Sequence, residues 1–143
     1  MIDAVIQRLE AKVPGIAGRI RGAAELADLM RNNRLPRQTP AAHVVPVGMR
    51  GAAVSASAGF YVQEFSETVG VVLTLRSHDA TGARALAQVD QLVRAVVEAI
   101  AGWTPGTETG VFRLDRGQLV NMSAGTLVYQ IDFSITDQLR ITP

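Results

Sequence analysis

The chain has 143 residues, no cysteine and a formal net charge of +1 at pH 7. This length suits one domain with its own core, and the lack of cysteine excludes disulfides, thiolate chemistry and cysteine-based zinc sites. The near-neutral charge argues against a general nucleic-acid binder, and no apolar run approaches the ~20 residues of a membrane span. Since the N-terminus also lacks the features of a secretory signal, we expect a single domain over residues 1–143, located in the cytoplasm.

The first part of the chain predicts two helices and two strands. In chain order these are a helix over 2–13, a strand over 17–21, a helix over 23–32 and a strand over 41–47. The first helix has apolar residues at helical spacing and ends at Pro14-Gly15. Pro46 places the second strand at a sheet edge or close to its own end.

Small residues fill positions 48–59, which differ from their surroundings. A segment of this composition cannot bury enough apolar surface to offset the entropy of ordering it. We therefore expect a mobile loop at about 48–59, or the tip of a long hairpin. A plain linker is the alternative interpretation.

The second part predicts a strand over 60–76, a helix over 82–101, and a hairpin of strands 111–121 and 125–136. The strand 60–76 is polar in its first half and apolar in its second, so its polar end is expected to project beyond the core. Trp103, just after the helix, is expected to pack back on the domain. Residues 115–117 suggest a bulge or a smaller turn in the first arm of the hairpin.

The last strand carries the clearest pattern in the chain. Large apolar residues occupy alternate positions, namely Leu127, Tyr129, Ile131, Phe133 and Ile135. This alternation indicates a strand with one buried face. With apolar stripes on helices 2–13 and 82–101, the pattern predicts an α+β fold, a mainly antiparallel sheet with helices packed on one face.

No catalytic motif of comparable clarity is present. The chain contains neither a phosphate-binding P-loop nor a G-x-S-x-G nucleophile motif. His43 and His78 are 35 residues apart, and the His78-Asp79 pair fits a helix-capping region better than a metal or base site. The carboxylates of Glu64 and Glu67 would point to opposite faces of a strand. We therefore expect no catalytic, cofactor-binding or metal-binding residues.

The polar face of the last strand allows two interpretations. Its members are Thr126, Gln130, Asp132, Ser134 and Thr136. They either form the wetted outer face of a sheet or contribute to a subunit interface, because sheet edges are sites where another chain can pair.

Several segments, taken together, resemble a known family. The most specific are Leu35-Pro36 with Thr39-Pro40-Ala41, the strand from Val69 to Arg76, and Gly102-Trp103-Thr104-Pro105. In pattern and order, over nearly the whole chain, the sequence resembles the phage tail terminator proteins, which include tail completion proteins of Mu-like prophages.

The resemblance implies a structural virion protein and no enzyme. Members form a hexameric ring at the head-proximal end of the tail tube, where they stop tube polymerisation and give neck or head-completion proteins a docking surface. The implied partners are further copies of the chain, the tail tube protein, the neck protein and the tape measure protein. DNA would pass through the ring without specific binding, and no membrane or cofactor is implied.

The polar half of strand 60–76 and the adjoining segment are the expected place of tube or subunit contact. The candidate interface residues are Arg50, Gln63, Glu64 and Glu67. Two alternatives to a tail terminator stay open. One is another tail-tube or head-completion protein of the same virion, and the other is a small-molecule enzyme with a site near His43 or His78.

Overall fold

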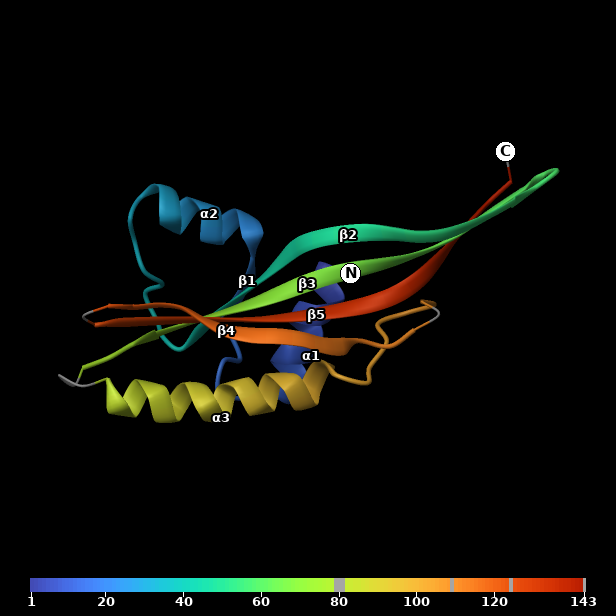
Figure 1. Ribbon diagram of the computed structural model, residues 1–143. Helices are drawn as coiled ribbons and strands as arrows, with labels where there is room; N and C mark the ends of the chain where they lie inside the picture. The colour runs from blue at the N-terminus through green and yellow to red at the C-terminus, as the bar shows by residue number, and fades with distance from the viewer. Residues whose placement is uncertain (79–81, 109, 124, 143) are drawn as a thin grey trace.

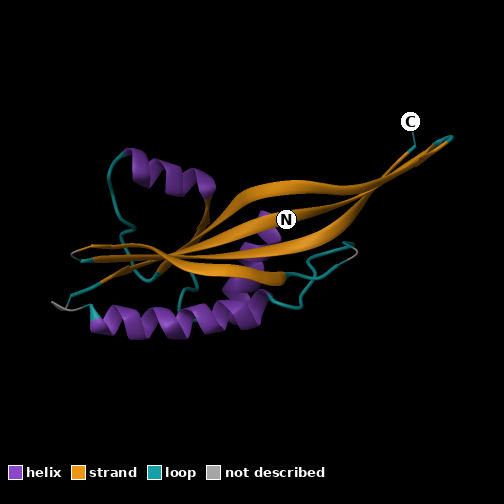
Figure 2. Ribbon diagram, in the orientation of Figure 1, coloured by secondary structure: helices purple, strands orange, loops and turns teal. Residues whose placement is uncertain are grey.

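The computed structural model describes residues 1–78, 82–108, 110–123 and 125–142. Its elements are α1 (Ile2–Lys12), β1 (Ile20–Gly22), α2 (Ala23–Arg31), β2 (Ala41–Ser57), β3 (Phe60–Arg76), α3 (Ala83–Ile100), β4 (Arg113–Ser123) and β5 (Thr126–Ile141). The strands form one sheet in the order β1-β2-β3-β5-β4. Only the short β1–β2 pair is parallel, and the other pairs are antiparallel. This confirms the predicted α+β class (Figures 1 and 2).

Two helices cover one face of the sheet. Figure 1 shows α1 and α3 on the same side, whereas α2 lies against the opposite face. Both covering helices bury an apolar stripe, with Val5 and Leu9 from α1 and Val89 and Val96 from α3. The expectation that helices 2–13 and 82–101 cover one face is therefore met. The second helix differs, since none of its residues is buried.

The core lies between α1, α3 and the middle of β3 and β5. Val71 and Leu73 of β3 are fully buried, as are Ile131 and Phe133 of β5. Of the five alternating residues of the last strand, Tyr129 alone is only partly buried. The buried odd-numbered residues share one face, as the period of a strand requires.

Trp103 packs back on the domain, as expected. Its ring stacks on Phe112, with 5.9 Å between the ring centroids, and the Arg8 guanidinium carbon lies 5.1 Å from its ring centroid. Arg8 also donates a hydrogen bond of 2.9 Å to the carbonyl of Ala99. These contacts fasten the end of α3 to α1 and to the start of the C-terminal hairpin.

Of the two expectations for residues 48–59, a mobile loop or the tip of a long hairpin, the structure has the hairpin tip. Strand β2 continues to Ser57 and pairs with β3 until Ser57 faces Phe60. The ladder satisfies the backbone hydrogen-bonding groups of this small-residue segment, which sequence composition alone cannot reveal. Two register shifts, one after Pro46 and one after Gly51, interrupt the ladder. The tight turn contains Gly59, whose φ of +79° favours glycine.

Strand β5 is also longer than predicted. It runs to Ile141 instead of ending at 136, and its last residues pair with the first half of β3. The three strands together form an extension that we call the outer ribbon, comprising residues 48–67 and 136–141. As expected from the polar first half of β3, the outer ribbon projects beyond the helices (Figure 1).

The C-terminal hairpin agrees with the prediction, with shifted ends. Strand β4 begins at Arg113 instead of residue 111, and the predicted bulge occurs between Leu114 and Arg116. A second irregularity lies between Leu119 and Asn121. No helix within the described ranges is long and apolar enough to cross a membrane.

Candidate assembly surfaces

The outer ribbon has two distinct faces, which the strand register defines. The β3–β5 ladder has no shift along its length, so residues 61, 63, 65 and 67 share the face of buried Val69 and Val71. We call this the helix-side face. Gln63 and Glu67 lie on it, whereas Glu64 and Arg50, which pairs with Ser66, lie on the opposite face. The four expected interface residues therefore divide two and two.

The helix-side face of the ribbon is largely apolar, and none of the described helices covers it beyond its inner end, where Ile2 of α1 lies near Met49 and Glu67. We call its apolar residues the ribbon stripe: Met49, Val54, Tyr61, Phe65, Leu139 and Ile141. Met49 is 68% exposed and Val54 is 53% exposed. The stripe continues the buried face of the sheet past the end of the core. The sequence does not reveal the stripe, because its small residues at 48–59 predict a loop and the alternation of the last strand ends at 136.

Gln63 has a structural role inside the ribbon. Its Oε1 accepts a hydrogen bond of 2.7 Å from the Tyr61 hydroxyl, and its Nε2 donates one of 3.3 Å to the Ala52 carbonyl. A Cβ at Gly51 would lie only 2.6 Å from the Gln63 Nε2, so glycine allows this close approach. In contrast, Arg50, Glu64 and Glu67 make no side-chain hydrogen bond or ion pair within the described parts of the chain. They are therefore available to a partner.

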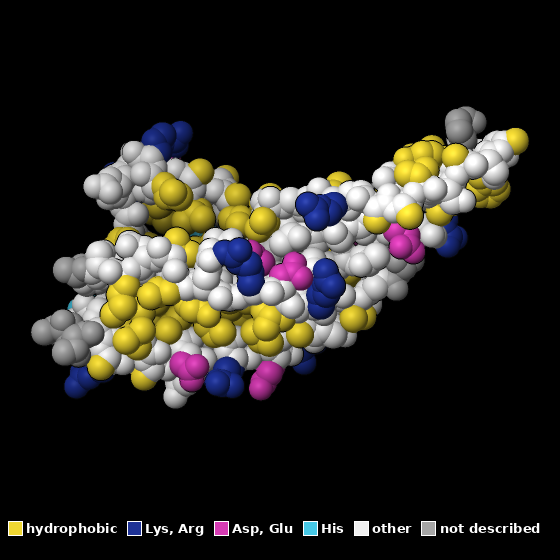
Figure 3. Space-filling view, in the orientation of Figure 1, with side chains coloured by type: hydrophobic (Ala, Val, Ile, Leu, Met, Phe, Trp, Pro, Cys, Tyr) yellow, Lys and Arg dark blue, Asp and Glu magenta, His cyan; other side chains and the backbone are white. Residues whose placement is uncertain are grey.

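A second exposed apolar surface lies along the β4 edge of the sheet. We call it the β4 patch: Leu86 of α3 with Leu114, Leu119 and Met122 of β4, each 42–47% exposed. Every residue of β4 whose side chain is described is exposed. Figure 3 shows apolar side chains gathered in this region and again at the end of the ribbon. A long edge strand with apolar side chains is a site for contact with another chain.

A third surface lies between α2 and the face of the sheet that α1 and α3 leave open. We call this hollow, of about 370 Å³, the α2 groove. Its apolar lining consists of Leu26, Leu29, Met30, Leu35, Pro36, Val72, Val120 and Val128. Arg34 is the charged residue in this lining. Figure 3 shows the hollow below α2, with apolar side chains inside it.

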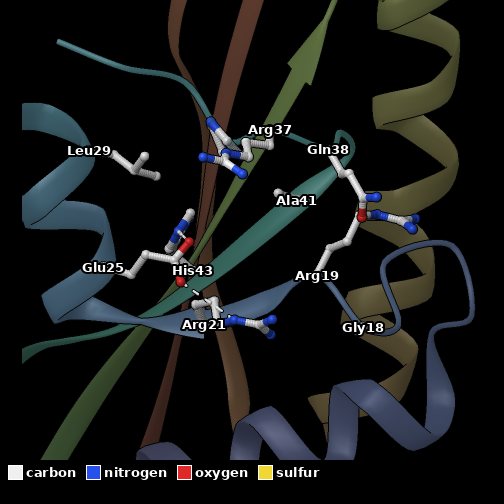
Figure 4. Close-up of a pocket in the computed structure, with 10 residues that line it drawn as sticks. Gly18, Arg19, Arg21, Glu25, Leu29, Arg37, Gln38, Ala41 and His43 are labelled. Carbon is white, nitrogen blue, oxygen red and sulfur yellow. Dashed lines mark ion pairs between the residues drawn. The ribbon is translucent and has the colours of Figure 1, made fainter. Parts of the chain in front are cut away.

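His43, the candidate of the enzyme alternative, lies beside a second pocket of about 430 Å³, which adjoins the α2 groove at Leu29 and Pro36 (Figure 4). The side chain is 1% exposed, and its Nε2 lies 3.6 Å from Glu25 Oε1 of α2, which is too long for a hydrogen bond. Neither ring nitrogen has a hydrogen-bond partner in the described structure. Burial lowers the pKa of His43 below its ordinary value of 6.5; Glu25 opposes this shift and Arg21 adds to it.

The pocket does not bring the two histidines together. His43 pairs with Val72, which precedes His78 by six residues of extended chain, roughly 20 Å. His78 is exposed, and Asp79 lies outside the described residues. Of the arginines beside His43, Arg19 serves the fold, because it donates hydrogen bonds to the carbonyls of Pro40 and Gly15. Within the described ranges, no three His, Asp or Glu side chains gather as metal ligands would.

Comparison with known proteins identifies the family of the chain. The family model of the phage tail terminator protein matches residues 2–143. The chain therefore belongs to the phage tail terminator family, and it is a structural protein of a phage-type virion that associates with other virion proteins. This class of protein is not normally enzymatic.

A solved structure has a similar fold. It is the virion of a native gene transfer agent particle, in which one chain aligns with a TM-score of 0.58. The alignment covers 97% of this chain and 95% of that chain, at 14% sequence identity. At this identity, the likeness concerns the fold alone. No curated protein matches the chain in sequence.

Proposed function

We propose that the protein caps the head-proximal end of a phage tail tube as a homo-hexameric ring. In this position it stops addition of tube subunits and offers a docking surface to the neck or head-completion protein. The tape measure protein is a further partner, and DNA passes through the ring without specific binding. The family match over residues 2–143 carries the proposal.

The uncovered surfaces of the chain support an assembly role. The ribbon stripe and the β4 patch are separate apolar areas on one small protein. Exposed apolar patches of this kind indicate contact with other proteins. Because the two surfaces differ, contacts between copies can be heterologous, and heterologous contacts that close produce a ring.

The two faces of the ribbon suit two kinds of partner. Arg50 and Glu64 lie on the polar face, where no described residue pairs with them, and we assign them to the tube protein. Glu67 lies on the helix-side face beside the ribbon stripe. Gln63 bonds to the Ala52 carbonyl and so stabilises the irregularity between Gly51 and Val54 on that face. We assign this face to contact between copies of the chain.

Electron microscopy of tail tubes assembled with and without the protein tests the proposal. We expect a ring at one end of each tube and shorter tubes as the ratio of this protein to tube protein rises. Arg50→Glu combined with Glu64→Arg should abolish capping, because it reverses both charges of the polar face. Lys12→Glu, at the exposed end of α1, is the control and should cap normally.

The same micrographs separate the alternatives. Long tubes formed by this protein alone would identify a tube subunit, and binding to heads instead of tube ends would identify a head-completion protein. The enzyme alternative requires His43 or His78. Under the proposal, a variant with both residues changed to alanine caps tubes as the unaltered protein does, provided that it folds.

A further inference from the structure

We propose that the ribbon stripe of one copy docks into the α2 groove of the next copy, with Glu67 of the stripe's face meeting Arg34 of the groove. The inference rests on the proposed ring function and names the surfaces that join its subunits. Family membership alone does not specify them. Four features of the molecule support this pairing.

Both surfaces are apolar and exposed to solvent. The stripe is an apolar row whose Met49, Val54 and Ile141 are each about half exposed or more. The α2 groove is an apolar hollow that its own chain leaves unfilled, since α2 contributes no buried residue. Joining them removes both apolar areas from water, which is favourable by roughly 25 cal/mol for each Å².

The groove can receive the stripe only from another copy. The ribbon and α2 lie at opposite ends of the molecule, as Figure 1 shows, so a chain cannot fill its own groove. The stripe runs across one face of a thin three-stranded extension, and the described helices leave the outer part of this face open to another copy. Each copy carries one stripe and one groove, so the contact is heterologous and repeats around a ring.

Charge selects the groove over the β4 patch as the receiving surface. The charged residues of the helix-side face of the ribbon are acidic, Glu67 and Asp137, whereas Arg50 and Arg140 lie on the other face. The groove presents Arg34, which has no ion pair within the described residues. Ion pairs flank both surfaces, Asp90–Arg94 and Arg113–Asp115 at the β4 patch and Asp28–Arg31 at the groove, so Arg34 is the charge that distinguishes the groove. Complementary charges across an interface fix its register.

The helix that forms one wall of the groove contributes no buried residue to the core. Its contact with the sheet includes the 3.6 Å approach of Glu25 to His43, and its other ion pairs are local, from Glu25 to Arg21 and from Asp28 to Arg31. Side chains of α2 such as Met30, 72% exposed, can therefore close over an incoming ribbon at little cost to the core.

Disulfide cross-linking tests the contact, because the chain has no cysteine of its own. We expect Leu139→Cys, in the stripe, to form a disulfide-linked dimer with Leu29→Cys, in the groove, when the two variants are mixed, assembled on tail tubes and mildly oxidised. Neither variant alone should give this dimer. A chain carrying both changes should give a ladder of linked species ending at the size of the ring. Leu119→Cys, in the β4 patch, is the matched control and should not link to Leu139→Cys.

A charge exchange provides the second test. Glu67→Arg or Arg34→Glu should each weaken self-association by about ten-fold, or ~1.4 kcal/mol, and the double variant should recover the loss. Glu64→Arg, on the opposite face of the same strand, should leave self-association unchanged. Circular dichroism confirms that each variant is folded before its association is measured by sedimentation.

The outcomes distinguish this inference from the proposed function. One contrary outcome is that rings cap tubes while Leu139→Cys forms a disulfide with Leu119→Cys, or with neither Leu119→Cys nor Leu29→Cys. In either case the stripe–groove contact is wrong, and the capping function stands. Failure of the double charge variant to recover association also overturns the contact. If the full chain forms no ring, alone or on tail tubes, the proposed function and the inference both fall.

Discussion

The covered middle of the sheet and the outer ribbon are made from the same strands but differ in what encloses them. In the middle, α1 and α3 cover the helix-side face, and Val71, Leu73, Ile131 and Phe133 are excluded from water. In the ribbon, the same face of β3 and β5 continues with Phe65, Leu139 and Ile141, and no helix covers it. Where helices cover the apolar face, its burial stabilises the fold. Where the face is exposed, it is available for contact with another protein chain.

The largest expected difference between the two regions concerns a buried charge. Ile131→Asp should leave the chain unfolded, because an unpaired carboxylate in this core costs several kcal/mol, comparable with the total stability of a small domain. Leu139→Asp, on the same face of the same strand but in the ribbon, should fold normally. Far-ultraviolet circular dichroism compares the two variants. If both variants were folded, or both unfolded, the distinction between the covered middle and the ribbon would be wrong.

A smaller difference is expected for aromatic side chains. Trp103→Ala should lower the free energy of unfolding by about 2–3 kcal/mol, less than for a fully buried aromatic residue, through loss of its contacts with Phe112 and Arg8. Phe60→Ala, at the ribbon tip where the side chain is 58% exposed, should change it by less than about 0.5 kcal/mol. Urea denaturation measures both values. A larger effect at Phe60 would show that the tip stabilises the isolated domain.

The smallest expected effect involves His43, under α2. Because burial lowers its pKa in the folded state, the unfolded chain binds the proton more readily below pH 6.5. Stability should therefore be complete above pH 6.5 and fall as the pH drops towards the folded-state pKa, by at most ~1.4 kcal/mol per pH unit. Urea titrations from pH 8 to pH 5 should show this slope in the His78→Ala control. His43→Phe should remove this residue's contribution, and an unchanged slope would contradict the assignment.

The covered region could be predicted from the sequence, because an element with one buried face has apolar residues at the regular spacing of a strand or a helix. Alternating apolar residues from 127 to 135 and helical spacing in residues 2–13 and 82–101 predicted the core and the two helices that cover it. Even the bulge near Asp115 was indicated by its Asp-Arg-Gly sequence. These features are local in sequence and depend on one buried face.

The ribbon and the groove were harder to predict, because their pattern depends on distant partners. Small residues at 48–57 form a strand only because β3 pairs with them, and the last residues of β5 extend because β3 reaches that far. The split of Arg50, Gln63, Glu64 and Glu67 between two faces needs the register of three strands. The α2 groove combines residues from α2, β3, β4 and β5, and no sequence motif marks it.

Removing the ribbon tests most directly whether fold and assembly belong to separate regions. A suitable variant joins Arg50 to Ser66 through Asn-Gly, which suits a two-residue hairpin turn, and ends at Asp137. Sedimentation and electron microscopy would compare it with the full chain in the presence of tail tubes. The account predicts a folded monomer that caps no tube ends. A shortened protein that forms rings and caps tubes as the full chain does would contradict it.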